Sequence, residues 1–335
     1  MSSPGLLSAI LLTAIGLSVV HAQAEKPIKD LSPDKSNPVL WTDPGSIRSR
    51  NLFYGPGGKE NEPTSPVRFL DEDSDGTSPK FDVRDKDGKK WKAKLGEEAQ
   101  PETVSTRLLW AVGFNTNENY FVQNLKVEGM PRLHRGREFV TNQGDVTAVR
   151  LQRSIRGNKS GTWSWKHNPF KDSREFNGLR VMMALISNWD LKDENNAVYI
   201  DRNTPDRKFY EVSDLGSSFG RSGKSYTDAL AKNNLPAYKH TRFVSKVTAE
   251  YVDFNFPTHP PFLYIFNLPF FIGKVRTRWI GKHIPRGDVK WIGTLLSQLS
   301  SQQIHDAFRA SGYSPSQADS FAEALQRRIA ELSQL

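Results

Sequence analysis

Apolar and polar residues first alternate regularly near residue 80, and this pattern predicts a β-hairpin. Phe81 and Val83 alternate with polar neighbours, residues 85–88 read Asp-Lys-Asp-Gly, and residues 91–95 alternate again. Strict alternation is typical of a half-buried strand. A polar turn containing glycine joins two such strands into a hairpin. Further strands are predicted over residues 120–122 and 147–151.

Two segments have the pattern of helices that lead into or support this sheet. Residues 101–112 carry Pro101 in the first turn and Gly113 just past the end, where each residue is favoured. Residues 176–187 are apolar nearly all round, so we expect a buried helix. Two more helices are predicted near 301–310 and 316–332.

The buried helix runs into a polar loop whose spacing points to phosphoryl transfer. Asp190 and Asn195 stand five apart, as in the kinase pattern H-R-D-x-x-x-x-N. Two predicted strands, 197–200 and 208–212, then lead to Asp214-Leu215-Gly216, a variant of D-F-G. Such chemistry needs one carboxylate for the attacking hydroxyl, and an amide and a second carboxylate for magnesium. We therefore predict Asp190 as the catalytic carboxylate, and Asn195 and Asp214 as Mg²⁺ ligands.

Phosphoryl transfer also needs a cation on the nucleotide phosphates and a partner that holds the cation. Lys94 is the natural candidate on the second hairpin strand, and Lys92 on the same face is the alternative. Glu102, in the first turn of the next helix, is the predicted partner of Lys94. Glu97 and Glu98 compete with Glu102 for this role.

The segment before the lysine strand carries a more specific resemblance. Gly76-Thr77-Ser78-Pro79-Lys80-Phe81 resembles the G-x-x-P-K nucleotide loop of HipA-type kinases, which are related to the phosphatidylinositol-kinase branch of the kinase fold. Asn188-Trp189-Asp190 with Asn195 is similar to the N-x-D-x-x-x-x-N catalytic loop of that family. The resemblance covers about residues 76–220.

The resemblance implies a two-lobed α+β fold, with a β-rich N-lobe and a helical C-lobe, that binds ATP and Mg²⁺. It places Gly76 and Lys80 in the loop over the phosphates, Lys94 on the phosphates and Glu102 on Lys94. Lys192, two residues after Asp190, either contacts the transferring phosphate or is solvated. The expected lobes are residues 76–135 and 136–335, the second including the C-terminal helices.

The N-terminal residues predict export. Residues 6–20 are mostly apolar, and Ala22-Gln23-Ala24 is a small-x-small cleavage pattern, so we interpret 1–24 as a signal peptide. An uncleaved anchor is the alternative, although the run is shorter than the roughly 20 residues of a spanning helix. The chain has no cysteine, which favours a bacterial periplasmic or cell-surface protein. Residues 25–75 are expected to form an irregular arm.

Composition limits the partners. The 335 residues carry a formal net charge of +9, which favours acidic partners such as nucleotides or lipid headgroups. The basic residues are scattered, so nucleic acid is not an expected partner. No transmembrane span is expected after signal cleavage, because prolines interrupt the aromatic stretch at 256–271. The phosphoryl acceptor is an unidentified protein, lipid or small molecule.

Two other functions compete with the phosphotransferase hypothesis. A kinase-like module that binds a ligand or partner without catalysis would share the same fold. Residues 216–220 also fit G-x-S-x-G, so Ser218 is a candidate hydrolase nucleophile, with Asp228 or Asp253 and His259 or His283 in the required order. The histidines have no zinc-ligand spacing.

Overall fold

The computed structural model describes residues 37–76, 78–220, 232–256 and 275–335. The predicted signal peptide and nearly all of the aromatic stretch lie outside these residues. Within the described ranges, no helix is both long enough and apolar enough to cross a membrane. The described chain mixes sheets and helices and is compatible with the predicted α+β class.

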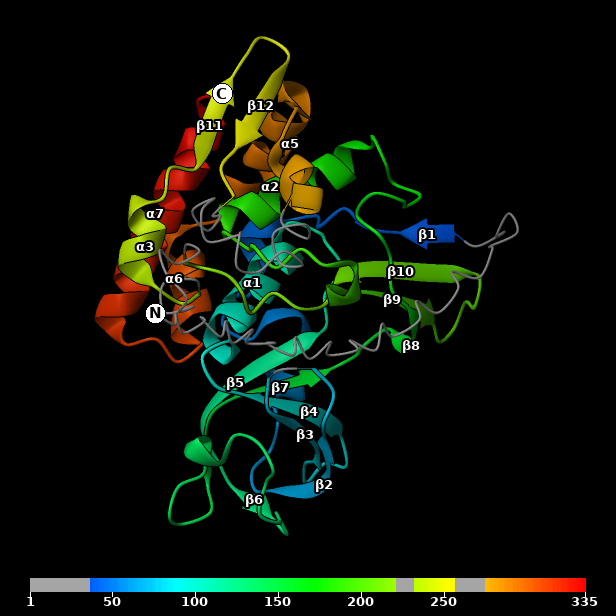
Figure 1. Ribbon diagram of the computed structural model, residues 1–335, viewed down its shortest axis with the longest axis vertical. Coiled ribbons are helices and arrows are strands. Elements are labelled where there is room, and N and C mark those ends of the chain that lie inside the picture. The colour runs from blue at the N-terminus through cyan, green and yellow to red at the C-terminus, as the bar shows by residue number, and fades with distance from the viewer. Residues whose placement is uncertain (1–36, 77, 221–231, 257–274) are drawn as a thin grey trace, which may run out of the picture. The chain divides into compact units, whose positions relative to one another are not determined.

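A six-stranded sheet forms around the predicted hairpin and occupies one end of the described structure (Figure 1). The strand order is β5-β7-β4-β3-β2-β6. The bounds are β2 Val67–Asp73, β3 Lys80–Arg84, β4 Lys90–Leu95, β5 Glu118–Leu125, β6 Val127–Glu128 and β7 Val146–Arg153. The predicted strands at 120–122 and 147–151 are confirmed within β5 and β7, which pair antiparallel.

The hairpin register gives this sheet two different faces. Phe81 pairs with Ala93 and Val83 with Trp91, and these residues are buried in the apolar core of the sheet. The alternate residues face the other way, so Lys80 lies opposite Lys94. The alternation of the sequence therefore separates an apolar face from a face rich in charged side chains.

Two smaller sheets complete the β structure. One has the order β1-β10-β9-β8, with bounds β1 Asn37–Val39, β8 Gly157–Gly161, β9 Asn196–Asp201 and β10 Arg207–Val212. The other has the order β11-β12-β13, with bounds Val244–Val247, Tyr251–Phe254 and Ile284–Pro285. The predicted strands at 197–200 and 208–212 are thus confirmed as the antiparallel pair β9 and β10.

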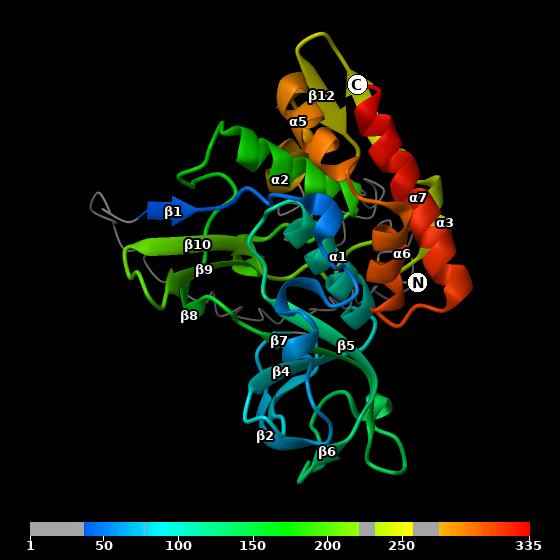
Figure 2. The same ribbon diagram turned by 180° about the vertical axis from the view of Figure 1, so that it is seen from behind.

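The helices pack around a second and larger apolar core. Their bounds are α1 Ala99–Ala111, α2 Arg174–Leu185, α3 Leu235–His240, α5 Arg286–Leu296, α6 Ser301–Arg309 and α7 Pro315–Ser333. Helix α2 packs against α5, and α1 contacts α6 as well as β5 and β7. Figure 2 shows the same arrangement from behind, with α1 between the six-stranded sheet and the other helices.

All four predicted helices are confirmed, within two residues at each end. Helix α1 begins two residues before Pro101, and Gly113 follows its end with φ +97°. Helix α2 is capped by Ser173, whose side chain accepts a hydrogen bond from the backbone of Phe176. Capping boxes at Ser300 and Ser314 start the last two helices.

Sheet pairing includes two segments that the sequence analysis did not assign to this sheet. The arm at 25–75 was expected to be irregular, but residues 67–73 form β2 and pair with β3. Four of these seven residues are charged, as is usual for a loop. Ion pairs such as that of Lys92 with Asp73, at 2.6 Å, nevertheless hold the strand in the sheet. Residues 146–153, assigned to the second predicted lobe, form β7, which pairs with β4 in the six-stranded sheet.

The rest of the described arm packs onto the helices instead of extending into solvent. Ile47 and Leu52 are buried in the larger core. The side chain of Gln303 donates to the backbone carbonyls of Ile47 and Arg50 at 2.9 and 2.8 Å. Arg107 of α1 donates to the carbonyl of Phe53. Side chains of α1 and α6 thus bind the backbone of a segment that has little periodicity of its own.

Arg328 of α7 ties the end of α2 to the rest of the helical core. Its guanidinium donates to the carbonyl of Leu185 at 2.9 Å, to Ser187 Oγ at 2.8 Å and to the carbonyl of Tyr238 at 2.9 Å. Arg328 is only 6% exposed. A buried guanidinium here satisfies carbonyl groups that the helix end leaves unpaired.

Replacing Arg328 with Met should lower the free energy of unfolding by about 3 kcal/mol, because the carbonyl of Tyr238 and the hydroxyl of Ser187 lose a buried donor, and the carbonyl of Leu185 keeps only the hydroxyl of Tyr238. Urea denaturation followed by circular dichroism measures this change. Arg327→Met is the control, since Arg327 is the exposed neighbour on the same helix, and it should change stability by no more than about 0.5 kcal/mol. Equal losses in the two variants would contradict this role of Arg328.

Candidate functional site

Lys94 lies where the sheet, α1 and the segment after β10 meet. Its Nζ is 3.2 Å from Glu102 Oε2 and 3.2 Å from Asp214 Oδ1. The Lys94 side chain is 7% exposed and that of Glu102 is 2% exposed. The structure thus brings together the predicted lysine, its predicted helix partner and a predicted metal ligand that is 120 residues away in sequence.

Glu98 is also a partner of Lys94, and its carboxylate is the nearer one. Glu98 Oε2 lies 2.7 Å from Lys94 Nζ. The same carboxylate accepts a hydrogen bond from Ser78 Oγ at 3.0 Å and pairs with Lys232 at 2.8 Å. The sequence analysis left open which glutamate is the partner of Lys94, and in the structure both Glu98 and Glu102 contact it.

Arg150 is a residue of the site that the sequence analysis missed. It lies opposite Lys94 in the β4–β7 register, and its Nη1 forms an ion pair with Glu102 Oε1. Glu102 thus bridges two buried cations. The sequence did contain a signal for Arg150, because it is a charged residue within the otherwise apolar predicted strand 147–151. A charge inside such a strand usually has an ionic partner or a function.

These contacts shift the acidity of the buried groups. Burial alone would lower the pKa of Lys94, but attraction by Glu102, Asp214 and Glu98 outweighs it and raises the pKa above the ordinary value. Burial would raise the pKa of Glu98, but Lys94 and Lys232 lower it to about 2. Burial raises the pKa of Glu102, against the opposing effect of Arg150 and Lys94. Lys94 and Glu98 are therefore charged at neutral pH.

The predicted catalytic loop is held by its own side chains. Ser187 follows α2 with φ +55°, which turns the chain out of the helix. Asn188 is fully buried, and its Oδ1 accepts a hydrogen bond from the backbone of Asp190 at 3.1 Å. The Asn195 side-chain amide donates to the backbone carbonyl of Asp190 at 2.7 Å and to its Oδ2 at 3.1 Å. The spacing of five residues therefore closes a hydrogen-bonded loop.

The backbone connects this loop to the segment that carries Asp214. The backbone N–H groups of Ser213 and Asp214 donate to the carbonyl of Asn195 at 2.8 and 3.2 Å. The backbone N–H of Gly216 donates to Asp214 Oδ1 at 3.2 Å. The two motifs found in the sequence thus form one unit of structure.

All eight predicted site residues line one cavity of about 690 Å³. They are Gly76, Lys80, Lys94, Glu102, Asp190, Lys192, Asn195 and Asp214. At its edge, Lys80 pairs with Asp73 at 3.5 Å and Lys192 pairs with Asp190 at 3.0 Å. Gly76 has φ +67°, and Thr77 lies outside the described residues. The alternative lysine, Lys92, also lines the cavity but pairs with Asp73 and Asp82.

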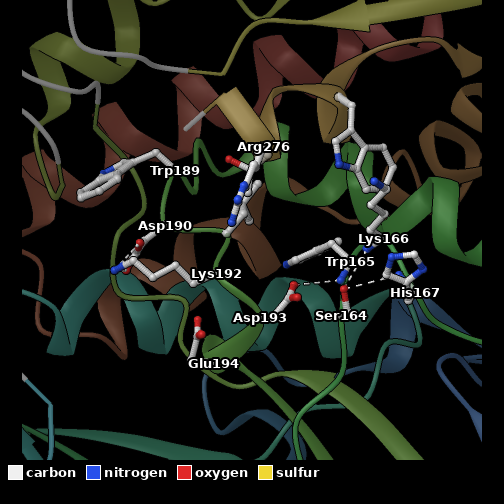
Figure 3. Close-up of a pocket in the computed structure, with 13 residues that line it drawn as sticks. Ser164, Trp165, Lys166, His167, Trp189, Asp190, Lys192, Asp193, Glu194 and Arg276 are labelled. Atoms are coloured by element: carbon white, nitrogen blue, oxygen red, sulfur yellow. Dashed lines mark hydrogen bonds and ion pairs between the residues drawn. The ribbon is translucent and has the colours of Figure 1, made fainter. Parts of the chain in front are cut away.

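A second cavity, of about 740 Å³, is lined by residues 189–194 of the predicted catalytic loop, by residues 164–167 and by residues 276, 277 and 279 (Figure 3). Asp190 and Lys192 line both cavities. In Figure 3 these two residues lie on one side of the second cavity, and Trp165 and His167 lie on the other. Asp190 therefore borders both cavities, as does Glu194.

Ser218, the candidate hydrolase nucleophile, has surroundings that do not suit that role. Its side chain is fully buried, and its Oγ has no hydrogen-bond partner in the described structure. The backbone N–H of His283 donates to Asp253 at 2.7 Å, but neither residue hydrogen-bonds to Ser218. The other candidates, Asp228 and His259, lie outside the described residues.

Two side chains of the first cavity, Asn195 and Asp214, have oxygen atoms that could contribute to the binding of a magnesium ion. The side-chain nitrogen of Asn195 donates to Asp190, so the atom of this side chain that could contact a cation is Oδ1. Asp214 uses Oδ1 for Lys94, and its side chain is 40% exposed. Mg²⁺ usually binds one or two protein oxygens together with substrate phosphates and water. In the described ranges, no group of three or more His, Cys, Asp or Glu side chains could hold a metal.

Comparison with known proteins leaves the family open. No protein-family model matches the chain, and neither a curated protein nor a solved structure matches it. The geometry of the site is therefore the basis for any functional proposal.

Glu211 lies behind the site, on the strand that leads to Asp214. It is 2% exposed, and its Oε1 accepts a hydrogen bond from Asn117 at 2.5 Å. The same Asn117 amide donates to the hydroxyl of Tyr199 at 3.1 Å. Burial raises the pKa of Glu211 to about 8. The folded protein therefore keeps a proton on this carboxyl at neutral pH.

The proton on Glu211 should make stability fall as the pH rises. Its contribution is complete below the unfolded pKa of 4.5 and is lost as the pH rises to about 8. The slope from this group reaches at most about 1.4 kcal/mol per pH unit. Glu211→Gln should remove that slope in urea denaturation at a series of pH values. Glu250→Gln at the surface is the control, and a slope unchanged in Glu211→Gln would contradict the assignment.

Proposed function

We propose that this chain is a kinase-like phosphotransferase that uses ATP and Mg²⁺. The observation that carries the proposal is the contact of buried Lys94 with both Glu102 and Asp214 at a cavity that Asp190 and Asn195 also line. Phosphoryl transfer depends mainly on positioning and on charge stabilisation of this kind. The expected order of these residues in the sequence adds support.

We further propose the two-lobed kinase-like arrangement for the described chain. Its support is the presence of two distinct apolar cores, one under the six-stranded sheet and one among the helices. Lys94 comes from the sheet, whereas Asp190 and Asp214 come from the segments beside α2 and β10. The predicted site then lies where residues of both parts meet.

Each residue has a role that its contacts support. Lys94 would bind nucleotide phosphates, and Glu102 with Arg150 would hold Lys94 in place. Asn195 and Asp214 would hold the magnesium ion, which neutralises phosphate charge when it is bound. Asp190 would orient the acceptor hydroxyl and accept its proton, and Lys192 would hold the Asp190 carboxylate.

The second cavity offers the acceptor a route to Asp190. Phosphoryl transfer brings the attacking and leaving oxygens into line, so nucleotide and acceptor approach from different sides. Asp190 lines both the 690 Å³ and the 740 Å³ cavity, which supports such an arrangement. The acceptor, whether protein, lipid or small molecule, would then present its hydroxyl from the cavity that contains Trp165.

A non-catalytic binding module remains the second candidate, and one contact favours it. Glu98 lies nearer to Lys94 than Glu102 does, at 2.7 Å against 3.2 Å. A carboxylate in that place keeps Lys94 from the position on the phosphates that catalysis requires. Measurement of turnover in addition to binding separates the two functions.

Asp190→Asn and Asp214→Asn should each lower ATP turnover by at least about 100-fold, because each removes a carboxylate that acts on the reacting groups. Turnover is measured as ADP release in the presence of Mg²⁺. Asp190→Asn should retain nucleotide affinity, whereas Asp214→Asn should weaken the dependence of that affinity on Mg²⁺.

Asp87→Asn, in the exposed turn of the β3–β4 hairpin, is the matched control. It should keep full turnover. If wild-type protein binds nucleotide but turns over ATP no faster than either variant, the phosphotransferase proposal is rejected in favour of the non-catalytic binding module. Wild-type protein that binds no nucleotide would reject both proposals.

A further inference from the structure

The Glu98 carboxylate is surrounded by donors from three separate segments. Ser78 comes from the loop before β3, Lys94 from β4, and Lys232 from the residues before α3. The contacts are 3.0 Å from Ser78 Oγ, 2.7 Å from Lys94 Nζ and 2.8 Å from Lys232 Nζ. A hydroxyl and two ammonium groups therefore converge on one anionic group.

This donor set has the composition of a phosphate site. Phosphate oxygens bind through charge-assisted hydrogen bonds from lysine and through neutral donors such as serine. The Ser78 and Lys94 side chains both line the cavity assigned above to the nucleotide, and so does Glu98. The only anion that these three donors share in the described structure is the carboxylate of Glu98 itself.

The surroundings fix the backbone of Glu98 beside these donors. Glu98 is the N-cap residue of α1, so its backbone is fixed by the helix. Gly216 packs so closely that a side-chain Cβ at that position would lie 2.6 Å from Glu98 Cβ. Asn233, next to Lys232, donates to Gln100 of α1 at 3.0 Å. The segment after Asp214 and the segment at Lys232 thus both pack on the start of α1.

We infer that Ser78, Lys94 and Lys232 form a binding site for a nucleotide phosphate, and that Glu98 competes with the phosphate for these donors. This inference rests on the proposed nucleotide site and adds two of its ligands, Ser78 and Lys232. Because Lys94 also contacts Glu102 and Asp214, it keeps compensating charges when phosphate displaces the Glu98 carboxylate. Glu98 then lowers the affinity of the resting protein for nucleotide.

The opposite role for Glu98 makes the opposite prediction. If Glu98 instead positions Lys94 for the phosphates, its removal weakens binding. If Glu98 competes, its removal strengthens binding, because a like charge no longer opposes the phosphate. The sign of the change in affinity therefore decides between the two roles.

The experiment measures the binding of ATP, pyrophosphate and adenosine by calorimetry. Glu98→Gln should bind ATP and pyrophosphate at least about tenfold more tightly than wild type, because removal of a like charge at close range relieves a cost of this size or more. Adenosine carries no phosphate, so its affinity should not change. Glu97→Gln, at the exposed neighbouring position, is the matched control and should leave all three affinities unchanged.

Two further variants test the donors. Ser78→Ala and Lys232→Met, each made in the Glu98→Gln protein, should weaken pyrophosphate binding by about tenfold, the value of one hydrogen bond to a charged group. Their thermal unfolding is measured alongside, so that a loss of folding is recognised. Unchanged pyrophosphate affinity in both folded variants would remove Ser78 and Lys232 from the site.

The possible failures are distinguishable. ATP affinity that is equal or lower in Glu98→Gln than in wild type overturns the inference and leaves the proposed function standing. An equal gain in affinity for adenosine also overturns it, since the change would not act on phosphate. If neither wild type nor Glu98→Gln binds any of the three probes, the nucleotide site of the proposed function fails, and the inference fails with it.

Discussion

The buried ammonium group of Lys94 is the constraint on which the site depends. A buried charge is costly unless opposite charges and hydrogen bonds compensate it. Here the compensation comes from Glu98 and Glu102 at the start of α1 and from Asp214 after β10. The sheet, the helix and the loop must therefore meet at one point for all three carboxylates to compensate the charge of Lys94.

Buried arginines extend the same principle into the helical core. Arg328 binds carbonyl groups at the end of α2, and Arg180 of α2 donates to the carbonyls of Ile280 and Lys282 at 2.9 and 2.6 Å. The predicted catalytic loop begins directly after α2, so these contacts also set the position from which Asn188 and Asp190 follow. Apolar packing gives these helices their stability, whereas the directional polar contacts set the position of their ends.

The periodic parts of the sequence predicted the structure well, and the irregular parts did not. The hairpin at β3 and β4 and the helices α1 and α2 follow from alternation, from helical periodicity and from capping residues. Strand β2 escaped prediction because its charged residues resemble a loop, and only pairing with β3 and β6 makes it a strand. Arg150 escaped as a site residue because its partner Glu102 lies 48 residues away.

The sequence by itself determined which chemical groups are present and in what order, and it made Lys94, Glu102, Asp190, Asn195 and Asp214 candidates for one site. Their convergence on one cavity, the sharing of Lys94 between Glu98 and Glu102, and the approach of Lys232 to Glu98 were decided by the tertiary structure. The reason is physical. Periodicity reports which face of its own element a side chain occupies, whereas contact between elements depends on how sheets and helices pack over more than a hundred residues of chain.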